Sequence, residues 1–214
     1  MNRRSAGAAA FIVGGLQYVT TEAIAAAAWV NPRYSYTYNY ISDLGVPEAQ
    51  TYDGRVVNSP LAWVMNTGFI LEGVFFLVGA VLLAHMFIGV RRHLFVSFAL
   101  VHGVGIVLVG LFHEAADAGS LHVGGAFASI IFGNLTALLV GLSARRLGLP
   151  SWFGILFIVV PILGLASEVV LVAEVFGPQF DGLWERGGVY SVTAFQVIFG
   201  AVVLRFVTSR QIRR

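Results

Sequence analysis

The chain has no cysteine and no lysine among its 214 residues. Without cysteine there is no thiol nucleophile, thiolate metal site or disulfide. Without lysine no Schiff base can form, which excludes retinal-binding and pyridoxal-phosphate chemistry. Charge is also scarce, because charged residues make up 11% of the chain and hydrophobic residues 57%, far from the balance of a soluble domain. These absences indicate a membrane protein and narrow the chemistry it can carry.

Arginine supplies all of the basic side chains, and its placement is regular. All thirteen basic residues are arginine. Most lie at every second boundary between long apolar segments: Arg3, Arg4, Arg91, Arg92, Arg145, Arg146, Arg205, Arg210, Arg213 and Arg214. Because cytoplasmic connections of membrane proteins are enriched in basic residues, this alternation predicts that both termini are cytoplasmic. The basic isoelectric point then reflects orientation, and nucleic acid is not expected as a partner.

Six apolar segments are long enough to cross a bilayer core of about 30 Å. They cover residues 7–30, 61–90, 94–112, 123–144, 152–176 and 188–207. The connections are short except for an outer loop over 31–60, and short connections make neighbouring helices antiparallel. We therefore predict an all-α polytopic membrane protein, a six-transmembrane-helix bundle that forms one domain over 1–214.

Small residues recur on one face of the fourth predicted span. Gly133, Ala137 and Gly141 follow one another at four-residue spacing. Small side chains let helices approach closely, so this spacing predicts a packing seam inside the bundle, with a dimer contact as the alternative.

Polar side chains inside the spans fall at matching depths. At a rise of about 1.5 Å per residue, Glu72 and His102 both lie near the middle of the bilayer on neighbouring helices, so we expect them to pair. Glu22 and Glu168 fall together in the outer third, close to Asn66. These two carboxylates can share a proton, bind a cation or be satisfied separately. Intramembrane polar groups fix helix packing, line a ligand cavity, or move protons and ions.

The long outer loop carries two recognisable features. Alternate residues from Tyr34 to Tyr40 are tyrosine, which places all four rings on one side if the segment is extended. They can anchor the loop at the headgroup level or form a rim for a lipid-like ligand. The next residues, Ser42-Asp43-Leu44-Gly45, can cap a short helix and end it in a turn. Asp43 can instead orient a histidine or bind a cation.

The second outer connection concentrates titratable groups. His113, Glu114, Asp117 and His122 follow one another closely, and antiparallel helices can bring both imidazoles to one mouth. Histidines with nearby carboxylates suit zinc or another divalent cation, with His113, Asp117 and His122 as the ligands. The same groups can act as a general acid and base without a metal, or be solvated loop charges and helix-end residues.

Four motifs together resemble those of one membrane family: Asn39-Tyr40-Ile41-Ser42-Asp43-Leu44-Gly45, Asn66 with Gly68, Gly110-Leu111-Phe112, and His122 with Gly124-Gly125. The chain is similar over roughly Gly7 to Gly141 to the bacterial and archaeal family catalogued as domain of unknown function 998. The resemblance implies a six-helix, multi-pass protein of the cell membrane, which we expect to be a bacterial plasma membrane. It also implies four positions to test: Ser42, Asp43, Asp117 and His122. It implies no reaction.

A looser similarity is to intramembrane zinc hydrolases of the alkaline ceramidase type, which combine serine, aspartate and histidine at a membrane surface. Those enzymes have seven spans and a late paired-histidine motif, whereas this chain has six predicted spans and no histidine after His122.

The leading functional prediction is an outer-facing polar pocket that binds a lipid or other amphiphile. As a hydrolase, the protein would also cleave or modify this ligand. The catalytic residues would be Ser42, Asp43, His113, Asp117 and His122. Either a divalent metal such as zinc or a histidine would activate water. Membrane lipids are the expected partners.

Two other functions remain open at this point. One is a non-enzymatic accessory subunit, whose outer loop docks a partner protein or a second copy of the chain. The other is a small proton-coupled transporter that uses Glu22, Glu72, His102 and Glu168.

Overall fold

Residues 2–211 are described by the structure, a computed structural model; Arg213 and Arg214, which contribute to the predicted orientation, lie outside these residues. Six long helices dominate it: α1 (Arg3–Ala28), α2 (Ala62–Leu83), α3 (Val90–Leu111), α4 (Gly119–Leu147), α5 (Ser151–Val172) and α6 (Asp181–Gln211). The structure has six helices long and apolar enough to cross a membrane. The predicted all-α, six-helix membrane fold is confirmed.

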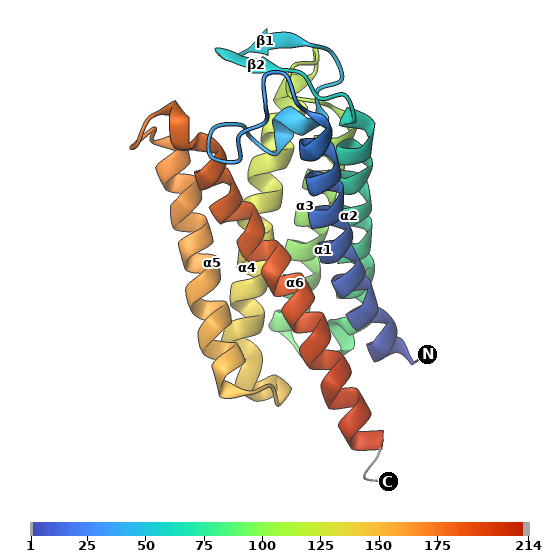
Figure 1. Ribbon diagram of the computed structural model, residues 1–214. Coiled ribbons are helices and arrows are strands. Elements are labelled where there is room, and N and C mark those ends of the chain that lie inside the picture. Colours follow the sequence, from blue (N-terminus) through green and yellow to red (C-terminus); the bar gives the residue numbers. More distant parts are fainter. Residues whose placement is uncertain (1, 212–214) are drawn as a thin grey trace.

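The helices form a closed ring (Figure 1). Each packs against its neighbours in sequence, and α1 packs against α6 to close the ring. Both ends of the chain lie at one end of the bundle, which we call the terminal end, together with the α2–α3 and α4–α5 connections. The opposite end, which we call the loop end, carries the long α1–α2 connection and the α3–α4 and α5–α6 connections. The side of the membrane that each end faces stays a prediction.

Helix α5 is kinked at a position that its sequence explains. Pro161 lies inside the helix, and Phe157, four residues earlier, has non-helical angles of φ −90° and ψ 17°. Proline donates no backbone hydrogen bond and its ring collides with the carbonyl four residues before it, so the helix bends there. A Cβ added to Gly141 of α4 would lie 2.3 Å from the Phe157 carbonyl oxygen. Glycine at 141 therefore makes room for the displaced carbonyl.

The small-residue face of α4 packs inside the bundle. Gly133 lies against α3 and α6, Ala137 is fully buried, and Gly141 lies against α5. The predicted packing seam is confirmed.

The bundle interior divides into two parts. In the half toward the terminal end, phenylalanines from α1, α2, α3, α5 and α6 are buried, and Phe11, Phe76, Phe195 and Phe199 pack edge to face or stacked. The half toward the loop end has a second apolar cluster, but polar and charged side chains are buried beside it. The polar chemistry of the protein is therefore concentrated at the loop end.

The α1–α2 connection differs from the extended segment predicted for its tyrosines. Backbone hydrogen bonds from Tyr38 and Asn39 to the Ser35 carbonyl turn the chain, so the tyrosines do not share one side. Tyr34 is buried, whereas Tyr36 is exposed. The expected short helix is present as the buried 3-10 helix η1 (Ser42–Gly45).

A small β-hairpin in this connection was not predicted. Strands β1 (Gln50–Tyr52) and β2 (Arg55–Val57) pair in antiparallel fashion across Asp53 and Gly54, which both have positive φ. Asp-Gly is a strong signal for a tight hairpin turn of this kind. The 3-10 helices η2 (Ala84–Met86) and η3 (Pro178–Phe180) complete the connections.

Helix α6 begins at Asp181, earlier than the predicted span at 188. The prediction placed the start too late because the first turns of the helix are charged. Asp181, Glu185 and Arg186 lower the local hydropathy, yet they belong to the helix. Arg186 is buried, and the half-buried Glu185 accepts a hydrogen bond from the Ile41 backbone N–H of the loop. Hydropathy cannot show that these charges have partners.

The chain lacks cysteine, so its topology can be tested with single introduced thiols. We expect Glu48→Cys, at an exposed site of the loop end, to react with a membrane-impermeant maleimide on intact cells. His93→Cys, exposed at the terminal end, should react only after the membrane is opened, and it leaves every arginine in place. The unsubstituted chain is the blank. The reverse labelling pattern would show that the termini are not cytoplasmic.

Candidate functional site

Asp43 is the centre of a buried ionic cluster at the loop end. The Arg55 Nε lies 3.3 Å from Asp43 Oδ1, and the two side chains are 5% and 0% exposed. The Asn39 amide and the Tyr40 backbone N–H donate to Asp43 Oδ2 at 2.9 and 3.1 Å. All of these groups come from η1, the residues before it and the hairpin. A buried charge pair needs this density of hydrogen bonds to offset its desolvation.

The hairpin positions Arg55 in this cluster. Strand β2 places Arg55 over the ring of Tyr40, 4.2 Å from its centroid, and within reach of Asp43. Burial alone would lower the pKa of Arg55, but the charges of Asp43 and Glu114 more than offset it and raise the pKa. Arg55 is therefore a permanent cation.

Glu114, from the α3–α4 connection, closes the cluster on the side of α4. The Ser42 hydroxyl donates to Glu114 Oε2 at 2.8 Å, and Glu114 Oε1 is buried without a hydrogen-bond partner. Burial, then the neighbouring carboxyl group of Asp43, raise the pKa of Glu114 well above its ordinary value; Ser42 and Arg55 offset only part of this. Ser42, Asp43 and Glu114 are thus brought together from two separate connections.

A second buried cluster joins α1 to the start of α6. Arg186 Nη2 lies 3.0 Å from Glu22 Oε1, and the Tyr190 hydroxyl donates to Glu22 Oε2 at 2.9 Å. Arg186 also donates to the Tyr34 hydroxyl and to backbone carbonyls of the loop, including that of Asn39 at 2.9 Å. This arginine therefore fastens the α1–α2 connection onto the helices.

A cavity of about 350 Å³ opens beside the first cluster, between the loop and helices α4, α5 and α6. Its polar side carries Arg55, Tyr40, Tyr52, Ser42, His122 and six acidic residues, namely Asp53, Glu114, Glu168, Glu174, Asp181 and Glu185. Its apolar side carries Val123, Ala126, Phe127, Ile130, Leu171 and Val172. The lining thus combines many acidic side chains with six apolar ones.

His122 lines this cavity with a defined tautomer. Its Nδ1 lies 2.8 Å from the carbonyl oxygen of Phe112 and 3.3 Å from that of Val109. A carbonyl only accepts, so Nδ1 carries the proton, and in the neutral ring Nε2 keeps its lone pair. None of the described residues bonds to Nε2. His122 can therefore act as a base toward a group in the cavity.

The structure places the other predicted outer-site residues away from the cavity. His113 is half-buried and does not line it. Asp117 is exposed. Within residues 2–211 no three His, Asp or Glu side chains converge as metal ligands, so the predicted set of His113, Asp117 and His122 is not assembled. Helix α4 turns His122 inward to the Phe112 carbonyl, whereas Asp117 points into solvent.

The intramembrane polar residues separate into different environments. The predicted pair is present, with His102 Nε2 3.0 Å from Glu72 Oε1. Glu22 and Glu168 do not pair with each other. Glu22 bonds to Arg186, whereas Glu168 lines the cavity with Oε2 buried and unpartnered. The Asn66 amide donates to the Gly45 carbonyl at 2.9 Å and so holds η1 on α2.

Sequence reasoning missed the two arginines that organise the loop end. Arg55 and Arg186 look like the stray basic residues of outer connections. The Asp-Gly turn two residues before Arg55 could have indicated a hairpin that turns it inward. No local signal identifies Glu22 as the partner of Arg186, because 164 residues separate them.

Residues 11–202 match the family described as "Protein of unknown function (DUF998)". The chain belongs to the DUF998 family. The match extends past the segment that carried the resemblance and includes most of the last two helices of this DUF998 protein. No curated protein and no solved structure matches the chain.

The raised pKa of Glu114 predicts that the folded protein loses stability as the pH rises. The folded chain holds this proton more tightly than the unfolded chain. The stabilisation of the fold by protonated Glu114 is therefore fully present below the ordinary glutamate pKa, and it is lost as the pH rises through the raised pKa of the folded state. We expect Glu114→Gln, which cannot ionise, to match the parent protein in acid and exceed it by about 1–3 kcal/mol above the raised pKa. Thermal unfolding in detergent across pH measures this. Asp117→Asn is the exposed control, and a gain that does not change with pH would contradict the assignment.

Proposed function

We propose that this DUF998 protein binds a lipid-like amphiphile with a cationic headgroup in the loop-end cavity. The observation that carries the proposal is the position of two unpartnered carboxylate oxygens, Glu114 Oε1 and Glu168 Oε2, on residues that line one cavity. Leaving such an atom buried and unsatisfied costs about 1–3 kcal/mol, more when it is charged. A cation that donates hydrogen bonds between them offsets that cost.

The charge balance of the lining favours a cation over an anion. Six acidic residues and one arginine line the cavity, and that arginine, Arg55, is already paired with Asp43. An anionic headgroup would meet uncompensated carboxylates and find no free cation among the described lining residues.

The apolar side of the cavity suits a hydrocarbon chain. Val123, Phe127 and Val172 belong to the lining and are also substantially exposed on the outside of α4 and α5. Exposed apolar side chains on spanning helices face the hydrocarbon of the bilayer. A ligand can therefore keep its chain among the lipids while its headgroup enters between α4 and α5. That geometry supports an amphiphile in preference to a small water-soluble cation.

A second candidate function is hydrolysis of such an amphiphile, and the tautomer of His122 favours it. The unprotonated Nε2 belongs to a residue that lines the cavity, and Ser42 lines the same cavity with its hydroxyl bonded to Glu114. A histidine base next to a bound ester can activate water. Dodecanoylcholine incubated with the protein should then release dodecanoate, and His122→Gln should abolish the release. An intact ester would leave binding as the function of the site.

Two probes with the same chain and opposite charge test the binding proposal. We expect dodecylammonium, whose N–H groups can donate to the carboxylate oxygens, to bind the protein in nanodiscs about tenfold more tightly than dodecanoate, the ratio that 1.4 kcal/mol produces. Native mass spectrometry counts the bound molecules. Glu168→Gln should remove most of the preference, because it removes an unpaired carboxylate from the cavity.

Glu48→Gln is the matched control, since it removes one acidic charge from the same end without touching the cavity. Equal binding of both probes, or an unchanged preference in Glu168→Gln, would overturn the proposal.

A further inference from the structure

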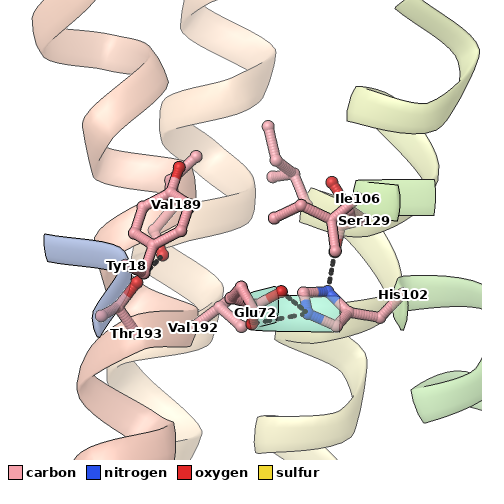
Figure 2. Close-up of a pocket in the computed structure, with 9 residues that line it drawn as sticks. Tyr18, Glu72, His102, Ile106, Ser129, Val189, Val192 and Thr193 are labelled. Carbon is pink, nitrogen blue, oxygen red and sulfur yellow. Dashed lines mark hydrogen bonds and ion pairs between the residues drawn. The ribbon is translucent and has the colours of Figure 1, made fainter. Parts of the chain in front are cut away.

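The buried pair of Glu72 and His102 sits in a cavity of its own near the middle of the bundle (Figure 2). His102 Nε2 lies 3.0 and 3.2 Å from the two Glu72 oxygens, and its Nδ1 lies 2.8 Å from the Ser129 carbonyl oxygen. A Cβ added to Gly133 would lie 2.7 Å from that Nδ1, so glycine at 133 gives the ring its space. The pair is held by groups from three helices, α2, α3 and α4.

The hydrogen bonds define how many protons the pair holds. The Ser129 carbonyl can only accept, so Nδ1 carries one proton in every state. A second proton lies between Nε2 and the carboxylate, either on His102 or on Glu72. Loss of this shared proton leaves a neutral imidazole facing an ionised carboxylate, and the net charge of the pair falls by one.

Small cavities lead from the pair toward the loop end. The cavity beside Glu72 and His102 has a volume of about 20 Å³, and a second of about 30 Å³ is lined by His122, Ser42 and Glu185. The two share Tyr18 and Ser129 in their linings. Each is large enough for one or two water molecules, and polar groups are present to bond them.

The second small cavity in turn borders the large loop-end cavity. Ser42, His122 and Glu185 line both of them. Residues shared between successive cavities thus form a series from the loop end to the middle of the bundle. Water in these cavities would connect the shared proton of the pair with the loop-end face.

The opposite side of the pair is closed by aromatic rings. Phe76 lies 4.0 Å from the His102 ring, centroid to centroid, and 5.0 Å from Phe11. Phe195 and Phe199 continue this packing toward the terminal end, and all four phenylalanines are fully buried. Access to the pair is therefore from one side.

Other titratable groups around the pair belong to α1, α4 and α6. Tyr18 on α1 lines its cavity and interacts electrostatically with Glu22, Glu72, Glu185 and Tyr190. Arg186 neutralises Glu22. Helix α4 contributes Ser129 to the cavity of the pair. The titratable group of α4 toward the loop end is His122, which lines the second small cavity. Helix α5 lines neither small cavity.

We propose that Glu72 and His102 form a proton-binding site that exchanges its shared proton with the loop-end face through these cavities and is closed toward the terminal end. The ligand of this site is a proton, and it arrives and leaves as hydronium or through bonded water. This site does not depend on the amphiphile proposed for the loop-end cavity. It gives the protein a means to respond to pH on the loop-end side.

Nitrogen-15 NMR of histidine-labelled protein in nanodiscs tests the proposal. The chain has five histidines, and loss of one signal in His102→Gln assigns the site. We expect the His102 Nε2 signal to show its deuterium isotope shift within minutes of transfer to D₂O. Val189→Leu adds bulk where the two small cavities meet and should slow this exchange at least tenfold. Val159→Leu, the same change on the exposed face of α5, should leave the rate unchanged.

Exchange in the parent protein that takes days, as in a sealed core, would overturn the proposal. Equal rates in the parent protein and Val189→Leu would overturn it too, because they place the proton path elsewhere. Ile106→Phe narrows the same junction from α3 and replaces Val189→Leu if that variant does not fold. None of these readouts uses the cationic amphiphile, so this result and the binding result can fail independently.

Discussion

The loop end depends on the neutralisation of buried charge. Asp43 and Arg55 are buried together inside one connection, and Glu22 and Arg186 are buried together between two helices. Removing one partner of such a pair costs about 3–5 kcal/mol, because the remaining charge is left buried and unpaired. Each arginine also bonds or stacks on a loop tyrosine. The first pair therefore braces the α1–α2 connection internally and the second fastens it to the helices, while apolar side chains such as Leu44 and Val57 pack beneath it.

Features that depend on local sequence could be predicted. The six spans follow from hydropathy, because a bilayer of fixed thickness demands a fixed length of apolar helix. The contact between Glu72 and His102 follows from depth, because helical rise is constant and the two helices are neighbours in sequence. The packing seam on α4 follows from its small residues. In each case a single regular geometry links residue number to position in space.

Features that depend on partners far away in the sequence could not be predicted. The start of α6 was misplaced because Asp181, Glu185 and Arg186 look like loop residues until their partners on α1 and in the loop are known. The candidate site was only partly identified for the same reason. Ser42, Asp43 and His122 lie in or beside the cavity, but Asp117 lies in solvent, and proximity in sequence cannot separate these cases.

The acidic residues of the loop end divide into two groups with different physical roles. Asp43 and Glu22 have arginine partners and several hydrogen bonds, so their charges are fully used in holding the fold. Glu114 and Glu168 each have a buried oxygen without a partner, and both residues line one cavity. A purely structural carboxylate gains nothing from an unsatisfied oxygen, since the cost falls on the folded state alone. The cationic group that we propose for the loop-end cavity would complete the hydrogen bonds of these two oxygens.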